Sequence, residues 1–364
     1  MTTTPSELAP LEFSVTRNLA AKSAAEREQI LRDPGFGSVF TDHMVDVCWS
    51  ERGGWHRPRV QPYGPIPLDP AAAVLHYGQE IFEGIKAYRH ADGSIHTFRA
   101  EDNARRLQRS AQRMALPELP VEYFMQSLRE LIAVDGAWVP SGEDQSLYLR
   151  PFEFAKEAFL GVRPAAKVAY YLIASPAGSY FTGGVKPVRI WLSETYARAG
   201  RGGTGQAKTG GNYASSLLPQ AEAYEQGCDQ VVFLDQDGNV EELGGMNVVF
   251  VFKDGRVVTP QSDSILEGIT RDSLLQLAED RGHTIERRAV SLQEWRDGVA
   301  SGEIVEVFAC GTAAVVTPIG ALVTRDGDET QPAGGLALSL REELTDIQYG
   351  RRDDKHGWLV RLDA

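Results

Sequence analysis

One lysine, Lys208, lies in a stretch of the chain that is unusually rich in glycine. Residues 201–213 read RGGTGQAKTGGNY. Each glycine costs backbone entropy on folding, so glycines on both sides of a lysine indicate that something approaches this backbone closely. A lysine that forms a Schiff base with an aldehyde needs small neighbours, because they let a flat ring lie near its amine. This pattern points to a lysine that binds pyridoxal.

Two other interpretations of the stretch remain open at this point. A phosphate-binding loop, Gly-x-x-x-x-Gly-Lys-Thr, is imitated by Lys208 and Thr209. The imitation fails because Ala207 replaces the glycine before the lysine, and because Gly210 and Gly211 are expected not to open the helix that must follow. A flexible surface loop has the same composition.

A pyridoxal cofactor requires an acid at its pyridine nitrogen, and Glu242 is the candidate. It lies in the segment VEELGGMN, residues 240–247, between apolar strands. An ionised carboxylate in such surroundings needs a cationic partner, which a protonated pyridine nitrogen supplies. The alternative is that Glu241 and Glu242 form the solvated end of a hairpin.

The cofactor phosphate needs an anion site, and two turns could provide it. Residues 266–270, LEGIT, run directly into a helix with apolar periodicity, and a helix N-terminus presents free N–H groups to an anion. A capped helix start with no ligand has the same pattern and is commoner. Residues 310–314, CGTAA, offer a second turn with a hydroxyl group, or form an ordinary junction between a strand and a turn.

The elements that must position these residues combine helices with clustered hairpins, which favours an α+β fold over a doubly wound sheet. Asp-Gly pairs at 237, 254 and 326 predict hairpin turns, and residues 87–98 predict another hairpin around 91–93. Further strands are expected over residues 40–49, 146–154, 167–175 and 304–308, and helices over 20–32, 101–114, 121–134, 215–226, 270–281 and 336–344.

The length of the chain predicts two domains, because 364 residues exceed one core of ordinary size. Proline and glycine interrupt the pattern between 176 and 187. We therefore expect one domain over residues 1–176, a linker over 177–187 and a second domain over 188–364.

Composition and charge exclude several classes of partner. A net charge of -13 opposes nucleic acid, and the seven histidines are scattered without the spacing of a metal site. Cys48, Cys228 and Cys310 are far apart in apolar stretches, which suits reduced, buried thiols. No leader or membrane-spanning run is visible, so a cytoplasmic location is expected.

Taken together, these segments resemble the branched-chain amino-acid aminotransferases among the fold-type IV pyridoxal enzymes. The resemblance runs from about residue 36 to 350. It rests on the lysine loop and on segments 36–44 (FGSVFTDHM), 75–77 (LHY), 82–87 (FEGIKA), 146–151 (SLYLRP), 242–247 (ELGGMN) and 346–350 (DIQYG). It implies a smaller amino-terminal α/β domain, a larger carboxy-terminal pseudo-barrel domain and pyridoxal 5'-phosphate as cofactor.

The resemblance also implies roles for individual residues. Lys208 would carry the cofactor as a Schiff base and shuttle the proton, with Tyr213 at the ring oxygen, Glu242 at the pyridine nitrogen and Leu266 against the ring face. The phosphate would be held by Arg106, Gly268, Ile269, Thr270 and Thr312. The substrate pocket would comprise Phe36, Tyr77, Phe82, Tyr148, Arg150 and Tyr180, with Val162 from a partner subunit and the amides of Thr312 and Ala313 at the α-carboxylate.

The implied reaction moves an amino group between L-leucine, L-isoleucine or L-valine and 2-oxoglutarate, with glutamate as the other amino acid, by a ping-pong route. A homodimer is implied, because Val162 would complete a neighbour's pocket. The alternatives are a D-amino-acid or amine transaminase of the same fold type, a pyridoxal lyase, or a non-catalytic protein that has kept the fold.

Overall fold

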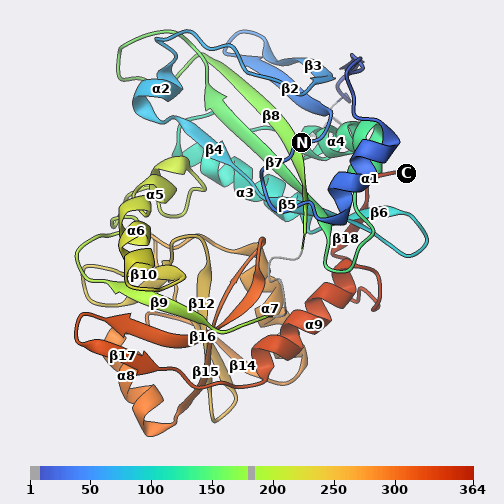
Figure 1. Ribbon diagram of the computed structural model, residues 1–364. Helices are drawn as coiled ribbons and strands as arrows, with labels where there is room; N and C mark the ends of the chain where they lie inside the picture. The colour runs from blue at the N-terminus through green and yellow to red at the C-terminus, as the bar shows by residue number, and fades with distance from the viewer. Residues whose placement is uncertain (1–8, 179–184) are drawn as a thin grey trace, which may run out of the picture. The chain divides into compact units, whose positions relative to one another are not determined.

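The structure is a computed structural model that describes residues 9–178 and 185–364. The chain divides into two compact units (Figure 1). The amino-terminal unit comprises Met1–Ser179 together with Lys355–Ala364, and the carboxy-terminal unit comprises Tyr180–Asp354. The chain therefore leaves the amino-terminal unit and later returns to it.

The amino-terminal unit is built on a nine-stranded sheet, counted over the described residues, in the order β1-β3-β2-β8-β7-β5-β6-β18, with β4 paired to β7. All pairs are antiparallel except β1 with β3. The strands are β1 Ser14–Val15, β2 His43–Ser50, β3 Gly54–Pro62, β4 Glu80–Phe82, β5 Ile85–Arg89, β6 Ile95–Phe98, β7 Ser146–Ala155, β8 Lys167–Ala177 and β18 Leu359–Arg361.

Helices α3 and α4 pack on one face of this sheet because their apolar residues recur every three or four positions. Ala104, Leu107 and Ala111 of α3, and Leu128 and Leu131 of α4, are buried in one core with the strands. The helices of this unit are α1 Ala24–Arg32, α2 Ala73–Tyr77, α3 Ala100–Arg113 and α4 Val121–Asp135, and the short 3-10 helix η1 Gly136–Trp138 follows α4.

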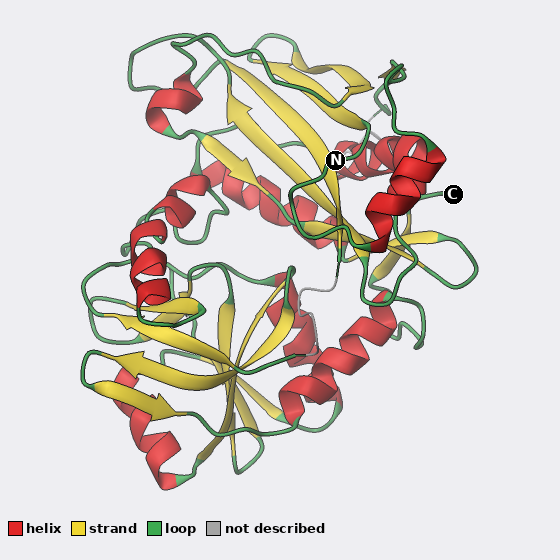
Figure 2. Ribbon diagram, in the orientation of Figure 1, coloured by secondary structure: helices red, strands yellow, loops and turns green. Residues whose placement is uncertain are grey.

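The carboxy-terminal unit also contains a nine-stranded sheet among the described residues, in the order β11-β10-β9-β16-β15-β12-β13-β14, with β17 paired to β16. Helices lie around the strands (Figure 2), and Trp295 of α8 is fully buried against Phe250 of β12. The strands are β9 Val188–Ser193, β10 Gln230–Leu234, β11 Val240–Leu243, β12 Asn247–Phe252, β13 Arg256–Thr259, β14 Thr284–Arg287, β15 Ile304–Gly311, β16 Val315–Thr324 and β17 Gly327–Thr330. The helices are α5 Gly210–Ala214, α6 Leu217–Glu225, α7 Ile269–Asp280, α8 Leu292–Ser301 and α9 Leu336–Gln348.

The predicted α+β class and the four predicted hairpins are confirmed. The Asp-Gly turns at 237, 254 and 326 join the antiparallel pairs β10–β11, β12–β13 and β16–β17, and the turn at 91–93 joins β5 to β6. The helix expected over 20–32 begins only at Ala24, because Ser23 caps it and forms a capping box with Glu26.

The three cysteines are free and buried. Within residues 9–178 and 185–364, no helix combines the length and the apolar character needed to cross a membrane.

Candidate active site

The glycine-rich stretch folds as a loop that is held in place by Asn212. The Nδ2 atom of Asn212 donates to the carbonyl oxygens of Thr204 at 2.8 Å and Ala207 at 2.9 Å, and its Oδ1 accepts from the hydroxyl of Thr204 at 2.7 Å. Asn212 itself is buried in helix α5, which starts at Gly210. Lys208 therefore lies between a loop fixed by Asn212 and the first turn of α5.

Three of the glycines differ from the expectation. A Cβ atom on Gly205 would lie 2.2 Å from the carbonyl oxygen of Ser264, so the close approach here is made by the chain's own backbone. Gly210 and Gly211 do open a helix, α5. The prediction that they would not open a helix is therefore wrong, because tertiary contacts override the weak helix propensity of glycine.

The amine of Lys208 contacts the hydroxyl of Tyr213. Lys208 Nζ lies 2.6 Å from Tyr213 Oη, and both side chains are half-buried. The two residues are five positions apart, with the start of α5 between them. An amine and a phenol that share a hydrogen bond in a partly exposed position can act together on one bound ligand. The amine can attack a carbonyl carbon, and the phenol can donate to an oxygen beside it.

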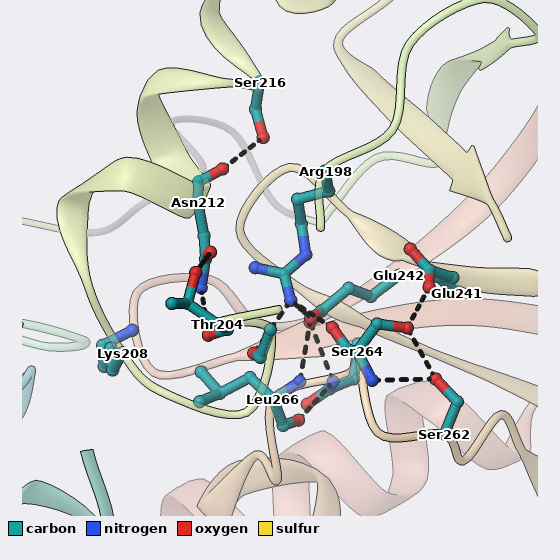
Figure 3. Close-up of polar contacts among 12 residues, drawn as sticks. Arg198, Thr204, Lys208, Asn212, Ser216, Glu241, Glu242, Ser262, Ser264 and Leu266 are labelled. Atoms are coloured by element: carbon teal, nitrogen blue, oxygen red, sulfur yellow. Dashed lines mark hydrogen bonds and ion pairs between the residues drawn. The ribbon is translucent and has the colours of Figure 1, made fainter. Parts of the chain in front are cut away.

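Glu242 is buried in β11 and its carboxylate is held from three sides (Figure 3). Its Oε1 atom accepts from the backbone N–H of Leu266 at 2.9 Å and lies 2.5 Å from Arg198 Nη2. Its Oε2 atom accepts from Asn247 Nδ2 at 3.1 Å. A carboxylate has about four lone-pair sites. Within the described part of the chain, one site on Oε2 is left for a further donor.

The electrostatic state of Glu242 reflects two opposing effects. Burial raises the pKa of this carboxyl group above its usual value, while the charge of Arg198, the N–H of Leu266 and the charge of Lys208 lower that pKa. Lys208 and Glu242, which are 34 positions apart in the sequence, are thus electrostatically coupled.

The interpretation of Glu241 and Glu242 as a solvated hairpin end is excluded, because their exposed fractions are 2% and 4%. Glu241 accepts a hydrogen bond from the hydroxyl of Ser264, and burial raises the pKa of its carboxyl group. The two acids are therefore neighbours on one buried strand, but their carboxyl groups have different partners.

The turn that leads into α7 is shaped around Asn247. Asn247 Nδ2 also donates to the carbonyl oxygen of Leu266 at 3.0 Å, and a Cβ atom on Gly268 would lie 1.9 Å from Asn247 Oδ1. Gly268 is the N-cap of α7 and offers no side-chain cap to the first turn, which contains Ile269 and Thr270. The first N–H groups of a helix attract an anion, so this turn is suited to a phosphate.

Thr312 and Ala313 lie in the turn between β15 and β16. Both are half-buried, and β15 pairs with β12, the strand that begins at Asn247. Lys208, Tyr213, Glu242, Leu266 and the first residues of α7 thus belong to the same unit as this turn.

Arg106 lies in the amino-terminal unit, where it forms a buried ion pair with Glu83. Arg106 Nε lies 2.7 Å from Glu83 Oε1, and Nη2 lies 2.8 Å from Oε2. Asn103 Nδ2 donates to the same Oε2 atom at 2.7 Å. The carboxylate of Glu83, which lies between β4 and β5, therefore orients Arg106 of α3. The sequence did not predict this contact.

Four of the expected pocket residues meet in the amino-terminal unit. Arg150 Nη2 donates to Tyr148 Oη at 3.1 Å, and its guanidinium carbon lies 4.8 Å from the centre of the Phe82 ring. The rings of Phe36 and Tyr148 make an edge contact with centroids 5.3 Å apart. A Cβ atom on Gly84 would lie 2.1 Å from Tyr148 Oη, so this glycine leaves room for the phenol.

The other expected pocket residues are placed differently. Tyr77 donates to the carbonyl oxygen of Leu160 at 2.6 Å. Val162 has 91% of its surface exposed in the single chain. Tyr180 lies outside the described residues.

Several residues that orient the site were not singled out in the sequence. Arg198, Asn212 and Ser264 are ordinary polar residues in loops or at a helix start, and nothing in their spacing marks them. Asn247 was noted only as the last residue of the segment ELGGMN, residues 242–247, and no role was predicted for it. Their roles depend on contacts between segments that are distant in the sequence.

Comparison with known proteins supplies the class and then the family. Residues 80–322 match the family described as amino-transferase class IV, so the chain is a class IV aminotransferase with the fold-type IV architecture. It is 58% identical to a branched-chain-amino-acid aminotransferase of Mycolicibacterium smegmatis, over 97% of this chain and 99% of the relative. A Mycobacterium tuberculosis protein of the same name is 57% identical, over 97% and 98%. The chain belongs to the branched-chain amino-acid aminotransferase family.

A branched-chain amino acid aminotransferase of known structure, here called the T.th. enzyme, has the same fold. Its structure with pyridoxamine 5'-phosphate matches with a TM-score of 0.70 and 31% identity, covering 87% of this chain and 98% of the other. Its structures complexed with N-(5'-phosphopyridoxyl)-L-glutamate and with 4-methylvaleric acid match with TM-scores of 0.68 and 0.69 at 30% identity and the same coverage.

Proposed function

We propose that this aminotransferase moves the amino group between L-leucine, L-isoleucine or L-valine and 2-oxoglutarate, using pyridoxal 5'-phosphate bound through Lys208. The observation that carries the proposal is the pairing of Lys208 Nζ with Tyr213 Oη at 2.6 Å, in the same unit as a buried carboxylate that keeps one acceptor site for a cation. The relatives that carry the family name supply the substrate class.

The residues present fit this cofactor. Glu242 Oε2 has a place for the pyridine N–H, Tyr213 is a donor for the ring oxygen, and the uncapped start of α7 suits the phosphate. Gly268, Ile269, Thr270, Thr312 and Arg106 are the proposed phosphate contacts, and Leu266 is the proposed ring contact. When bound, the cofactor acts as an electron sink for the α-carbon of the amino acid.

The chain's own residues would then orient the reactants and move one proton. Lys208 Nζ holds and moves the proton of the substrate α-carbon, and Tyr213 fixes the position of that amine through their hydrogen bond. Glu242 supplies a negative charge that is buried away from water, where a fixed charge acts most strongly.

One pocket must accept both an apolar and an acidic side chain. Phe36, Phe82 and Tyr148 offer aromatic surface for a branched aliphatic group, and Arg150 offers a cation that already contacts Tyr148. The T.th. enzyme is solved with both a glutamate adduct and a branched aliphatic acid, which supports the same dual use here. Tyr77, Tyr180 and Ala313 complete the proposed pocket.

The decisive experiment traps the lysine. Borohydride reduction of the purified holoenzyme should attach the cofactor to the peptide that contains Lys208, and Lys208→Ala should lose both turnover and the near-visible absorbance of bound cofactor. Lys186→Ala, at an exposed lysine of the same unit, serves as the matched control and should keep both. Attachment to a peptide without Lys208 would sink the assignment.

Turnover with L-leucine, D-alanine and a simple amine, each with 2-oxoglutarate, distinguishes this reaction from that of a D-amino-acid or amine transaminase. The resemblance to the branched-chain family, carried here by Arg150 and the aromatic residues around it, argues against these alternative reactions. We expect L-leucine to be the best donor. Faster turnover of D-alanine or of the amine would replace the proposal by one of these reactions.

We also propose that the enzyme is a cytoplasmic homodimer in which a linker over residues 177–187 joins the two domains; the expected carboxy-terminal bound of 188–364 is corrected by the return of Lys355–Ala364 to the first unit. The proposal for the dimer rests on Val162, which is 91% exposed although it is apolar. Sedimentation of the holoenzyme tests it. In sedimentation, Val162→Asp should lower the dimer fraction, and in turnover assays the same variant should have a higher KM for leucine. A wild-type holoenzyme that sediments as a monomer would refute the proposed dimer.

A further inference from the structure

Arg198 is a buried cation that the proposed reaction does not yet use. It lies in the loop between β9 and α5, with 4% of its surface exposed. Its Nη2 atom donates to the carbonyl oxygens of Ser264 at 2.7 Å and Gly205 at 3.1 Å, and lies 2.5 Å from Glu242 Oε1 (Figure 3). These contacts connect the lysine loop, the segment before α7 and the buried carboxylate.

The two oxygens of Glu242 are used unequally because of Arg198. Oε1 accepts the N–H of Leu266 and lies 2.5 Å from the guanidinium atom Nη2 of Arg198, so these two groups occupy its surroundings. Oε2 accepts only from Asn247 among the described residues. The carboxylate is therefore fixed in a rotation that leaves Oε2 as the oxygen with room for another donor.

Charge balance requires a cation at this position. Glu242 is buried, and desolvation raises the pKa of its carboxyl group by favouring the neutral acid, whereas a nearby cation favours the ionised form. Arg198 is the largest of the influences that oppose this desolvation, ahead of Leu266, Lys208 and Arg271. A neutral Glu242 could still form a hydrogen bond, but it could not stabilise a positive charge on a pyridine nitrogen.

We propose that Arg198 is a positioning residue of the aminotransferase: it keeps Glu242 ionised and holds its carboxylate so that Oε2 stays available to the pyridine nitrogen of the cofactor. This inference rests on the proposed function, in which Glu242 is the partner of that nitrogen. Arg198 acts through Glu242 and not on the substrate, so its removal should change kcat and the properties of bound cofactor more than KM for leucine.

The first test follows the absorbance of the bound cofactor in the holoenzyme over a range of pH. In Arg198→Met the cofactor nitrogen loses its charged partner and its proton, and the linkage between the cofactor and Lys208 becomes more basic. We expect the midpoint of the absorbance titration to rise by about one pH unit or more, equivalent to a tenfold change in a proton equilibrium. Arg198→Lys keeps the positive charge and should restore most of the wild-type midpoint.

A double-mutant cycle distinguishes action through Glu242 from a general loosening of the loop. Arg198→Met should lower kcat by about tenfold to a hundredfold, as when one preorganised electrostatic partner is removed. In the Glu242→Gln background the same change should lower kcat further by less than about threefold, because coupled groups are not additive. Thr204→Val, which removes the hydroxyl contact to Asn212, serves as the loop control, and its effect should add to that of Glu242→Gln.

The outcomes distinguish a failure of the proposed role of Glu242 from a failure of the proposed role of Arg198. If wild-type protein binds no pyridoxal phosphate, or if Glu242→Gln leaves kcat and the titration unchanged, the proposed role of Glu242 fails. If Glu242→Gln has its effect while Arg198→Met shifts neither the midpoint nor kcat, or if the two effects simply add, Arg198 is structural and the inference is overturned. Arg198→Gln replaces Arg198→Met in both tests if the Met variant does not fold.

Discussion

Glu153 buries a carboxyl group inside the amino-terminal unit, and we expect its ionisation to govern how the stability of this protein depends on pH. The residue lies in β7, opposite Tyr170 of β8 and Ile81 of β4, and none of its surface is exposed. Neither carboxyl oxygen has a hydrogen-bond partner among the described residues. Burial therefore raises the pKa of Glu153 well above its usual value.

The sign of the pH dependence follows from this shift. Because the pKa is higher in the folded chain than in the unfolded chain, the folded chain binds more protons at every pH between the two values. The free energy of unfolding must then fall as pH rises from the unfolded pKa through the folded pKa. One proton gives a slope of at most about 1.4 kcal/mol per pH unit.

The change to test is Glu153→Gln, which keeps the shape of the side chain and removes the titration. We expect the stability difference between the two proteins to be constant below about pH 4, where the carboxyl group is neutral in both the folded and the unfolded wild type, and the Gln variant to become progressively more stable relative to wild type toward pH 8. Melting temperatures of both holoenzymes across this range measure the difference. Glu122→Gln, at an exposed position of α4, controls for the change in net charge.

The reasoning fails if the difference between wild type and Glu153→Gln is the same at every pH. Such a result would mean that the pKa of the carboxyl group is the same in the folded and the unfolded chain. A variant that is less stable than wild type only at high pH would show that the ionised carboxylate has a partner in the folded protein.

Three further predictions concern other parts of the chain. Glu306 accepts from the first two N–H groups of α9, so Glu306→Ala should cost about 0.5–2 kcal/mol of unfolding free energy in urea titrations and Glu306→Gln less; equal midpoints would contradict this. Arg150→Met should slow the half-reaction with glutamate at least about tenfold more than that with leucine in stopped-flow measurements, because a buried carboxylate loses its cation; equal slowing would make Arg150 structural. Gly268→Ala should displace Asn247 and lower the melting temperature and cofactor retention, whereas Gly211→Ala, which has open space around its Cβ, should lower neither; retention equal to wild type in Gly268→Ala would remove Asn247 from the site.

Local signals in the sequence predicted much of the fold. The Asp-Gly turns and the apolar spacing of α3, α4 and α7 depend on residues within a few positions of each other, and these elements are where they were expected. Helix α8 was missed although Leu292, Trp295 and Val299 recur at helical spacing and pack on the core of the carboxy-terminal unit, because polar residues and Gly298 interrupt this short pattern. Strand β18 was missed because its pairing with β6 joins segments that are far apart in the sequence, Ile95–Phe98 and Leu359–Arg361.

The candidate site shows the same division. Lys208 and Glu242 stood out by type and by neighbours, and the structure places one beside Tyr213 and buries the other. Arg198 did not stand out, because an arginine in a loop becomes informative only when Glu242, Gly205 and Ser264 are brought to it by folding. The unpartnered carboxyl of Glu153 was likewise hidden in a strand of mixed composition.

The return of the chain to its first unit has a consequence for biosynthesis. Strand β18 adds to the edge of a sheet whose other strands all precede residue 178, and the whole carboxy-terminal unit is inserted between them. On the ribosome, the inserted unit emerges complete while the first sheet still lacks its edge strand. The N–H and C=O groups of β6 on that side therefore have no strand partner until Leu359–Arg361 has been synthesised.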